Sequence, residues 1–207
     1  MPQRQIAIYG GSFDPFTNAH RAIVDTLAPS FDEIYLVPCA QNPEKSNSPI
    51  ASKHRLEMIK LGIADSPAKN KLKISTFETD NPPPSYTLNT IHHFKTLFPT
   101  DELTFIMGAD SYVKFNAWKR IDGTEDWTEI AKLANIIVIT RPGSVIQQHD
   151  WMKIIENKVR ICDTLNVDIS ATKIRQALAA GDLEFANANL HPDVLDYILE
   201  NELYEIL

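Results

Sequence analysis

The stretch IAIYGGSFDPFTNAHRAIVDTL, residues 6–27, determines the fold that the rest of the chain can adopt. Its apolar run, residues 6–9, stops at Gly10 and Gly11, as a buried strand does when it ends in a tight turn. Beyond the turn, four residues have the spacing of one face of a helix: His20, Ile23, Val24 and Leu27. A second apolar run, residues 33–37, follows this helix. Strand, helix and strand at this spacing form a βαβ unit, which predicts a parallel sheet.

The same alternation continues along the chain. Further strands are predicted from apolar or β-branched runs at residues 72–77, 103–107, 135–140 and 159–162. Helical periodicity separates these runs and extends to the end of the chain, at residues 52–64, 88–98 and 170–207. The sequence therefore predicts an α/β fold, a Rossmann-like doubly wound parallel sheet with a helical C-terminal section. We expect a single domain over residues 1–207, with a core at 1–168 and the C-terminal helices at 169–207.

The composition narrows the classes of function. Lys and Arg number 20 against 27 Asp and Glu, so the formal net charge is −7. An acidic net charge argues against a general nucleic-acid binder, whose surface should be basic. Cys39 and Cys162 have no metal-ligand spacing, which argues against a disulfide framework or a structural zinc site and suits reduced thiols in the cytoplasm. Residues 1–5 carry no apolar signal core and no run approaches the roughly 20 apolar residues of a membrane span, so we expect a cytoplasmic protein.

The Gly10-Gly11 turn is a candidate phosphate site. In an open parallel sheet, ligands bind beyond the carboxyl ends of the strands, which is where this turn is expected. Paired glycines let the backbone approach a phosphate closely. His20, in the first turn of the following helix, can donate a hydrogen bond to a phosphate oxygen. The alternative is a plain glycine turn followed by a core histidine on an apolar stripe.

A second candidate phosphate site is the stretch ISATKIR, residues 169–175. Ser170 is a favourable helix N-cap, and Thr172, Lys173 and Arg175 follow within the first turn and a half. Hydroxyls, a guanidinium and backbone amides at one helix start suit a polyphosphate. The alternative is a capped surface helix with solvated cations.

Together the two motifs resemble a known family. A strand followed by Gly-Gly-Ser-Phe-Asp-Pro and His20, with a later Ser-x-Thr-x-x-Arg helix start, is similar to the HxGH superfamily of nucleotidyltransferases. Further stretches resemble the superfamily's bacterial nicotinate-nucleotide adenylyltransferase branch and occur in the same order as there: residues 85–90, 108–111, 118–119, 141–143 and 197–204. The resemblance therefore spans nearly the whole chain.

Four positions depart from the family's pattern. Thr17 stands where the family has the first histidine of HxGH, and Ala19 stands where it has the glycine. Ala171 removes one hydroxyl near the expected phosphates. Glu44, beside Lys45, places an anion where a neutral or cationic residue is usual, which would reduce the affinity for ATP.

The resemblance implies an enzyme that transfers the adenylyl group of ATP to nicotinate mononucleotide, giving deamido-NAD and pyrophosphate. It implies that His20 stabilises charge on the α-phosphate, with Thr17 as a supporting donor. The ATP-binding residues that it implies are Gly10, Gly11, Ser12, Phe13, Lys45, Ser170, Thr172 and Arg175. The substrate-binding residues that it implies are Thr87, Asp110, Trp118, Lys119 and Arg141. Mg²⁺ would arrive bound to ATP, and no metal site of the protein itself is expected.

Individual roles follow from the same resemblance, each beside a plain structural alternative. Trp118 would stack on the pyridine ring, or it could belong to the core. Asp110 would bind a ribose hydroxyl, or it could cap a helix. Arg141 could simply end a strand, and Lys45 could be a solvated lysine.

The expected partners are the two substrates, with no nucleic acid and no membrane, and a homodimer is one option for the oligomeric state. Two alternative functions stay open. Thr17 fits a pantetheine-phosphate adenylyltransferase, in which threonine also occurs at this position. Thr17, Ala171 and Glu44 together fit a non-catalytic nucleotide-binding regulator of the same fold.

Overall fold

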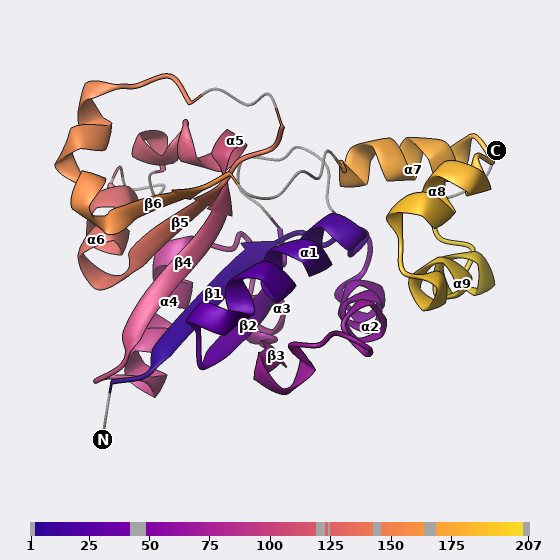
Figure 1. The fold of residues 1–207 in the computed structure, drawn as a ribbon, viewed down its shortest axis with the longest axis horizontal. Helices are drawn as coiled ribbons and strands as arrows, with labels where there is room; N and C mark the ends of the chain where they lie inside the picture. Colours follow the sequence, from indigo (N-terminus) through magenta and orange to yellow (C-terminus); the bar gives the residue numbers. More distant parts are fainter. Residues whose placement is uncertain are drawn as a thin grey trace.

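The computed structural model describes residues 3–41, 49–118, 123, 125–142, 146–163 and 169–204. Within these ranges, six parallel strands form one sheet in the order β3-β2-β1-β4-β5-β6 (Figure 1). The strands are β1 (Gln5–Gly11), β2 (Glu33–Pro38), β3 (Leu72–Ile74), β4 (Glu102–Gly108), β5 (Asn135–Ile139) and β6 (Val159–Cys162). This is the strand order of a doubly wound Rossmann sheet, so the predicted fold class is confirmed.

Helices connect the strands and follow the last of them. The α-helices are α1 (Asn18–Leu27), α2 (Ser52–Gly62), α3 (Phe77–Asp80), α4 (Thr87–Leu97), α5 (Ala109–Tyr112), α6 (Asp126–Leu133), α7 (Ala171–Ala179), α8 (Leu183–Asn189) and α9 (Pro192–Glu200). Short 3₁₀ turns are η1 (Ala28–Ser30), η2 (Lys69–Lys71), η3 (Phe115–Ala117), η4 (Asp150–Ile154) and η5 (Glu156–Lys158). Across the described ranges, no helix combines the length and the apolar character that crossing a lipid bilayer requires.

Each central strand sends alternate side chains into two different cores. In β1, Ala7 and Tyr9 pack with α1, α2 and the C-terminal helices, whereas Ile6 and Ile8 pack with α4 and α6 on the other face. Ile6 and Ile8 are fully buried. Burying one such side chain contributes about 1.5–3 kcal/mol, so the alternation fixes which face each strand residue occupies.

The strand order places the glycine turn at the centre of the sheet edge. β1 pairs with β2 through Gly11 and Pro38, and it pairs with β4 through Tyr9 and Ile106. The direction of winding reverses between β1 and β4, which opens a crevice beyond their carboxyl ends. The turn after β1 therefore lies at the switch point of the sheet.

The C-terminal helices pack beside α2, at the yellow end of the ribbon in Figure 1. Gly181, with φ 72, makes the turn between α7 and α8, and Pro192 begins α9, so the C-terminal section is three helices. The hydroxyl of Tyr197 in α9 lies 2.9 Å from Nδ1 of His54 in α2. This hydrogen bond adds to the apolar packing between the two helices, to which α9 contributes the buried side chains of Val194, Leu195 and Ile198.

Two segments differ from the sequence prediction. The strand predicted at residues 72–77 ends at Ile74, because Asp80 N–H donates to Thr76 O at 2.8 Å and closes a helical turn. The ring of Phe77 then stacks on His93, with centroids 4.0 Å apart. Helix α6, which the sequence pattern does not predict, covers the crossover from β4 to β5 with Trp127 and Ile130 buried. Its eight residues are too few for a convincing periodic pattern.

Candidate active site

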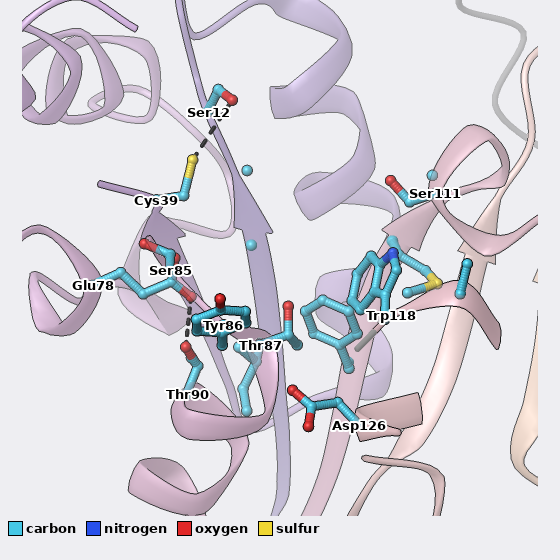
Figure 2. A pocket seen from close by; sticks show the side chains of 17 residues that line it. Ser12, Cys39, Glu78, Ser85, Tyr86, Thr87, Thr90, Ser111, Trp118 and Asp126 are labelled. Carbon is cyan, nitrogen blue, oxygen red and sulfur yellow. Dashed lines mark hydrogen bonds between the residues drawn. The ribbon is translucent and has the colours of Figure 1, made fainter. Parts of the chain in front are cut away.

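A cavity of about 390 Å³ lies beyond the carboxyl ends of β1, β2 and β4. Figure 2 shows Trp118 and Ser111 on one side of it and Glu78, Ser85 and Thr90 on the other. The described residues that line it are Ile8, Gly10, Gly11, Ser12, Cys39, Glu78, Ser85, Tyr86, Thr87, Thr90, Phe105, Met107, Gly108, Ser111, Ala117, Trp118 and Asp126. The predicted residues Gly10, Gly11, Ser12, Thr87 and Trp118 are thus brought together around one cavity.

The glycine turn, Gly10 and Gly11, forms part of the wall of this cavity. A Cβ at Gly11 would lie 3.1 Å from the ring of Phe13, so the close approach favours glycine there. Phe13 itself has a left-handed backbone, φ 48, and its side chain is buried in the core under α1. Ser12 lines the cavity, whereas Phe13 is not among the lining residues.

His20 is fixed by the residue that begins its helix. Thr17 is the N-cap of α1, and its backbone N–H donates to Nδ1 of His20 at 3.0 Å. Because Nδ1 accepts, the proton of the neutral imidazole is carried by Nε2. The ring centroids of Phe13 and Phe16 lie 5.2 and 5.5 Å from the centroid of the imidazole, so both rings pack against it. Thr17 thus orients His20 through its main chain as well as its side chain.

A second, smaller pocket of about 100 Å³ adjoins the cavity through Gly108, which lines both. His20, Asp110, Arg141 and Ile169 are among the residues that line it. The structure therefore places Asp110 and Arg141 beside His20, and not beside Thr87 and Trp118 as their shared assignment to substrate binding suggests. Ile169 directly precedes the start of α7, so this pocket faces the second phosphate motif.

The far end of the large cavity combines an aromatic ring with a helix start. Trp118 packs edge-on against Phe105 and Phe115, with ring centroids 6.5 and 5.2 Å apart. Its buried Nε1 has no hydrogen-bond partner among the described residues. Opposite it, α4 begins at Thr87, and within the described structure the Tyr86 side chain makes no capping hydrogen bond. Uncapped amides at a helix N-terminus favour an anion.

Sequence reasoning misses a buried polar group in this cavity. Glu78 accepts a hydrogen bond from the Thr90 hydroxyl at 2.5 Å, and the Ser85 hydroxyl accepts the Ala40 N–H at 2.9 Å. Burial raises the pKa of Glu78, and hydrogen bonds from Thr90 and Ser85 and the charge of Arg55 oppose that rise. Nothing in the local sequence marks Glu78, and only the fold shows that it faces the cavity.

Cys39 and Asp126 are two further lining residues that the sequence does not single out. The Sγ atom of Cys39 lies 3.6 Å from the hydroxyl oxygen of Ser12. Asp126, at the start of α6, is 3% exposed. Asp126 lies in the cavity wall because the unpredicted α6 begins there, and Cys39 lies in it because it directly follows β2.

The start of α7 lies next to the glycine turn. Ser170 is its N-cap position as predicted, although in the part of the chain that the structure describes its side chain makes no capping hydrogen bond. Arg175 donates from Nη1 to Asp14 O at 2.6 Å and from Nη2 to the Thr172 hydroxyl at 3.3 Å. Thr172 is exposed and Arg175 is half-buried, so both can reach a ligand at the edge of the turn.

Two predicted residues, Lys45 and Lys119, lie outside the described residues, as does Glu44. Among the residues that the structure describes, no three His, Cys, Asp or Glu side chains are grouped as a metal site would require. The assignment of individual roles to the other predicted residues stays a prediction.

The chain is similar to known proteins over nearly its whole length. The cytidylyltransferase-like family matches residues 8–177. A probable nicotinate-nucleotide adenylyltransferase of Hydrogenovibrio crunogenus is 32% identical over 98% of this chain and 98% of the relative. Another protein of that name, from Methylacidiphilum infernorum, is 35% identical over 97% of this chain and 92% of the relative.

Solved structures share the fold. Plasmodium falciparum nicotinic acid mononucleotide adenylyltransferase, complexed with NaAD, superposes with a TM-score of 0.82 at 24% identity over 99% of both chains. The same enzyme complexed with APC gives a TM-score of 0.78. The family match and the near full-length relatives confirm the predicted resemblance: the chain belongs to the cytidylyltransferase-like family, in its nicotinate-nucleotide adenylyltransferase branch.

Proposed function

We propose that this chain transfers the adenylyl group of ATP to nicotinate mononucleotide and releases pyrophosphate. The observation that carries the proposal is the shared wall at Gly108, which joins the cavity of Trp118 and Thr87 to the pocket of His20. A mononucleotide in the large cavity and an ATP α-phosphate beside His20 would meet at the Gly10-Gly11 turn. The names of the near full-length relatives support the same reaction.

The reaction asks little covalent chemistry of the protein. A phosphate oxygen of the mononucleotide, already an anion, forms a bond to the α-phosphorus, and the bond from that phosphorus to the bridging oxygen of pyrophosphate breaks. No protein nucleophile or general base is needed, so catalysis rests on positioning and on neutralising charge. His20 would donate its Nε2 proton in a hydrogen bond to the α-phosphate, and Thr17 would keep the ring in that orientation.

The triphosphate is assigned to the glycine turn and the start of α7. Backbone N–H groups near Gly11 and the Ser12 hydroxyl would bind the phosphates from one side. Thr172 and Arg175, with the amides after Ser170, would bind the β- and γ-phosphates from the other. Mg²⁺ would enter with ATP and would supply positive charge that offsets the charge of the phosphates. Lys45 remains a predicted further cation.

The ribose of ATP is assigned to the small pocket. Asp110 lies there with His20, so its carboxylate would accept hydrogen bonds from ribose hydroxyls. Arg141, in the same lining, adds positive charge beside the phosphates. This refines the sequence-based assignment, which groups both residues with the acceptor.

The acceptor is assigned to the large cavity. Trp118 offers a flat apolar surface on which a pyridine ring can stack. The amides at the start of α4, around Thr87, would donate to the carboxylate of the ring. Lys119, directly after Trp118 in the sequence, is a predicted additional contact.

The direct test uses the wild-type protein with Mg²⁺ and ATP, with and without nicotinate mononucleotide. We expect equal amounts of pyrophosphate and dinucleotide, formed only when both substrates are present. ATP binding without turnover would instead identify a non-catalytic nucleotide-binding regulator. A cytoplasmic location and a homodimeric state are further parts of the proposal, to be checked by fractionation and by light scattering.

A further inference from the structure

The end of the chain folds back onto the glycine turn. After α9, Glu202 and Tyr204 adopt left-handed backbones, with φ 50 and 64. Leu203 N–H donates to Ile198 O at 3.0 Å and closes this reversal. Left-handed backbone is costly for residues other than glycine, so it persists only where surrounding contacts hold it. The contact that Tyr204 gains is a hydrogen bond from its hydroxyl to Oδ1 of Asp14 at 2.6 Å.

Asp14 also contacts Arg175, the proposed ligand of the β- and γ-phosphates. Nη1 of Arg175 donates to the main-chain oxygen of Asp14 at 2.6 Å. The same nitrogen lies 3.9 Å from Oδ2 of the Asp14 side chain, beyond hydrogen-bonding distance. The Asp14 side chain is 12% exposed, and that of Arg175 is 35% exposed. The carboxylate is therefore close to the guanidinium without occupying its donors.

This arrangement affects whether Arg175 binds the Asp14 carboxylate or a phosphate of ATP. A carboxylate and a phosphate bind a guanidinium through the same paired N–H donors. Held as it is, the Asp14 carboxylate forms only a long ion pair with Arg175; released from Tyr204, it could rotate to accept hydrogen bonds from the guanidinium and compete with ATP for them. Held by Tyr204, its carboxylate points toward the end of the chain.

We infer that Tyr204 is a positioning residue for ATP, which acts by holding the Asp14 carboxylate away from the phosphate-binding donors of Arg175. The inference rests on the proposed function in one respect, because it takes Arg175 as a ligand of the ATP phosphates. It assigns a role in nucleotide binding to the last described residue of the chain, 190 positions from its partner.

The first test is Tyr204→Phe, which keeps the ring and removes the hydroxyl. Calorimetry without acceptor should give ATP binding about tenfold weaker than wild type, the usual loss for one hydrogen bond to a charged group. AMP binding should stay close to wild type, because AMP has no β- or γ-phosphate. Tyr197→Phe is the matched control: it removes another hydroxyl of the same helical section, bonded to His54, and should leave ATP binding unchanged.

The second test is rescue by Asp14→Asn. In the Tyr204→Phe background, this change should restore most of the ATP affinity, because a neutral amide cannot form an ion pair with Arg175. A merely structural role for the Tyr204 hydroxyl predicts no such recovery. Asp14→Asn alone should bind ATP at least as tightly as wild type, and this result is informative even if Tyr204→Phe fails to fold.

Three results would overturn the inference: wild-type ATP affinity in folded Tyr204→Phe, equal losses for ATP and AMP, or no rescue by Asp14→Asn. These measurements need no acceptor and no turnover. Failure of the proposed function would appear separately, as absent pyrophosphate release by the wild-type protein with nicotinate mononucleotide.

Discussion

The backbone N–H of Thr17 donates to Nδ1 of His20 at 3.0 Å, within a capping box that also joins the Thr17 hydroxyl to His20 N–H. Threonine stands here where the resembled family has the first histidine of HxGH. Thr17 is 2% exposed and serves as the cap that orients the remaining histidine. The departure therefore changes a supporting residue and leaves the proposed donor to phosphate in place.

His20→Ala should reduce turnover by roughly 10²–10³-fold, the usual cost of removing one donor that stabilises developing charge. Thr17→Val keeps the backbone N–H to Nδ1, so its loss should be much smaller. Steady-state kinetics of pyrophosphate release measure both, with circular dichroism to confirm folding. Near wild-type turnover in folded His20→Ala would remove His20 from the mechanism.

Arg175→Ala should weaken ATP binding while affecting AMP binding much less, because only ATP carries the phosphates assigned to the guanidinium. Removing a charge-assisted hydrogen bond costs about 1.5–3 kcal/mol, or about one to two powers of ten in affinity. Calorimetry with the two nucleotides measures the difference. If both affinities fell equally, Arg175 would act on the fold or on another part of the nucleotide.

Gly62→Ala should destabilise the protein, although helix propensity alone predicts the opposite sign. A Cβ at Gly62 would lie 2.4 Å from Cδ1 of Phe16, whose side chain is 1% exposed and has no room to move. We expect a loss of about 1–3 kcal/mol in the free energy of unfolding, measured in urea. In a Phe16→Leu background the loss should shrink, and an unchanged loss would contradict the assigned contact.

Glu78 should make the stability of the protein fall with rising pH. Its pKa is raised above the usual 4.5 by burial, so the folded state binds the proton more tightly than the unfolded state. The free energy of unfolding must then decrease as pH rises from 4.5 through the raised pKa. Glu78→Gln does not titrate and should show a shallower decrease in urea unfolding between pH 4.5 and neutrality. Identical slopes would mean that Glu78 ionises as it does in the unfolded chain.

Local patterns carry most of the fold. The run ending at Gly10, the helix after it and the strands at β2, β4 and β5 are all visible in the sequence, because burial on two faces of a sheet imposes apolar runs. α6 is not visible, because it is short and its apolar residues follow a segment without periodicity. The division at residues 168 and 169 into core and C-terminal helices remains a prediction.

Contacts between residues that are far apart in the sequence could not be predicted from it. Residues near the two phosphate motifs could be picked out one by one, but the pairing of Asp14 with Tyr204 depends on how α9 packs on α2. The same holds for Glu78, whose burial beside Thr90 depends on the turn between α3 and α4. Asp110 and Arg141 meet beside His20 only because β4 and β5 are neighbours.

A comparison of kcat/KM for nicotinate mononucleotide, its amide analogue and phosphopantetheine shows directly which acceptor the enzyme uses. Trp118 offers a surface to a pyridine ring, and phosphopantetheine has no ring to stack. Amides at the start of α4 match a carboxylate, whereas an amide substrate leaves buried donors unmatched at about 1–3 kcal/mol each. We therefore predict that the nicotinate form is preferred over the amide form by at least roughly tenfold, that phosphopantetheine is not used, and that Trp118→Ala raises KM for both pyridine substrates. Preference for the amide form, or turnover of phosphopantetheine, would contradict the account.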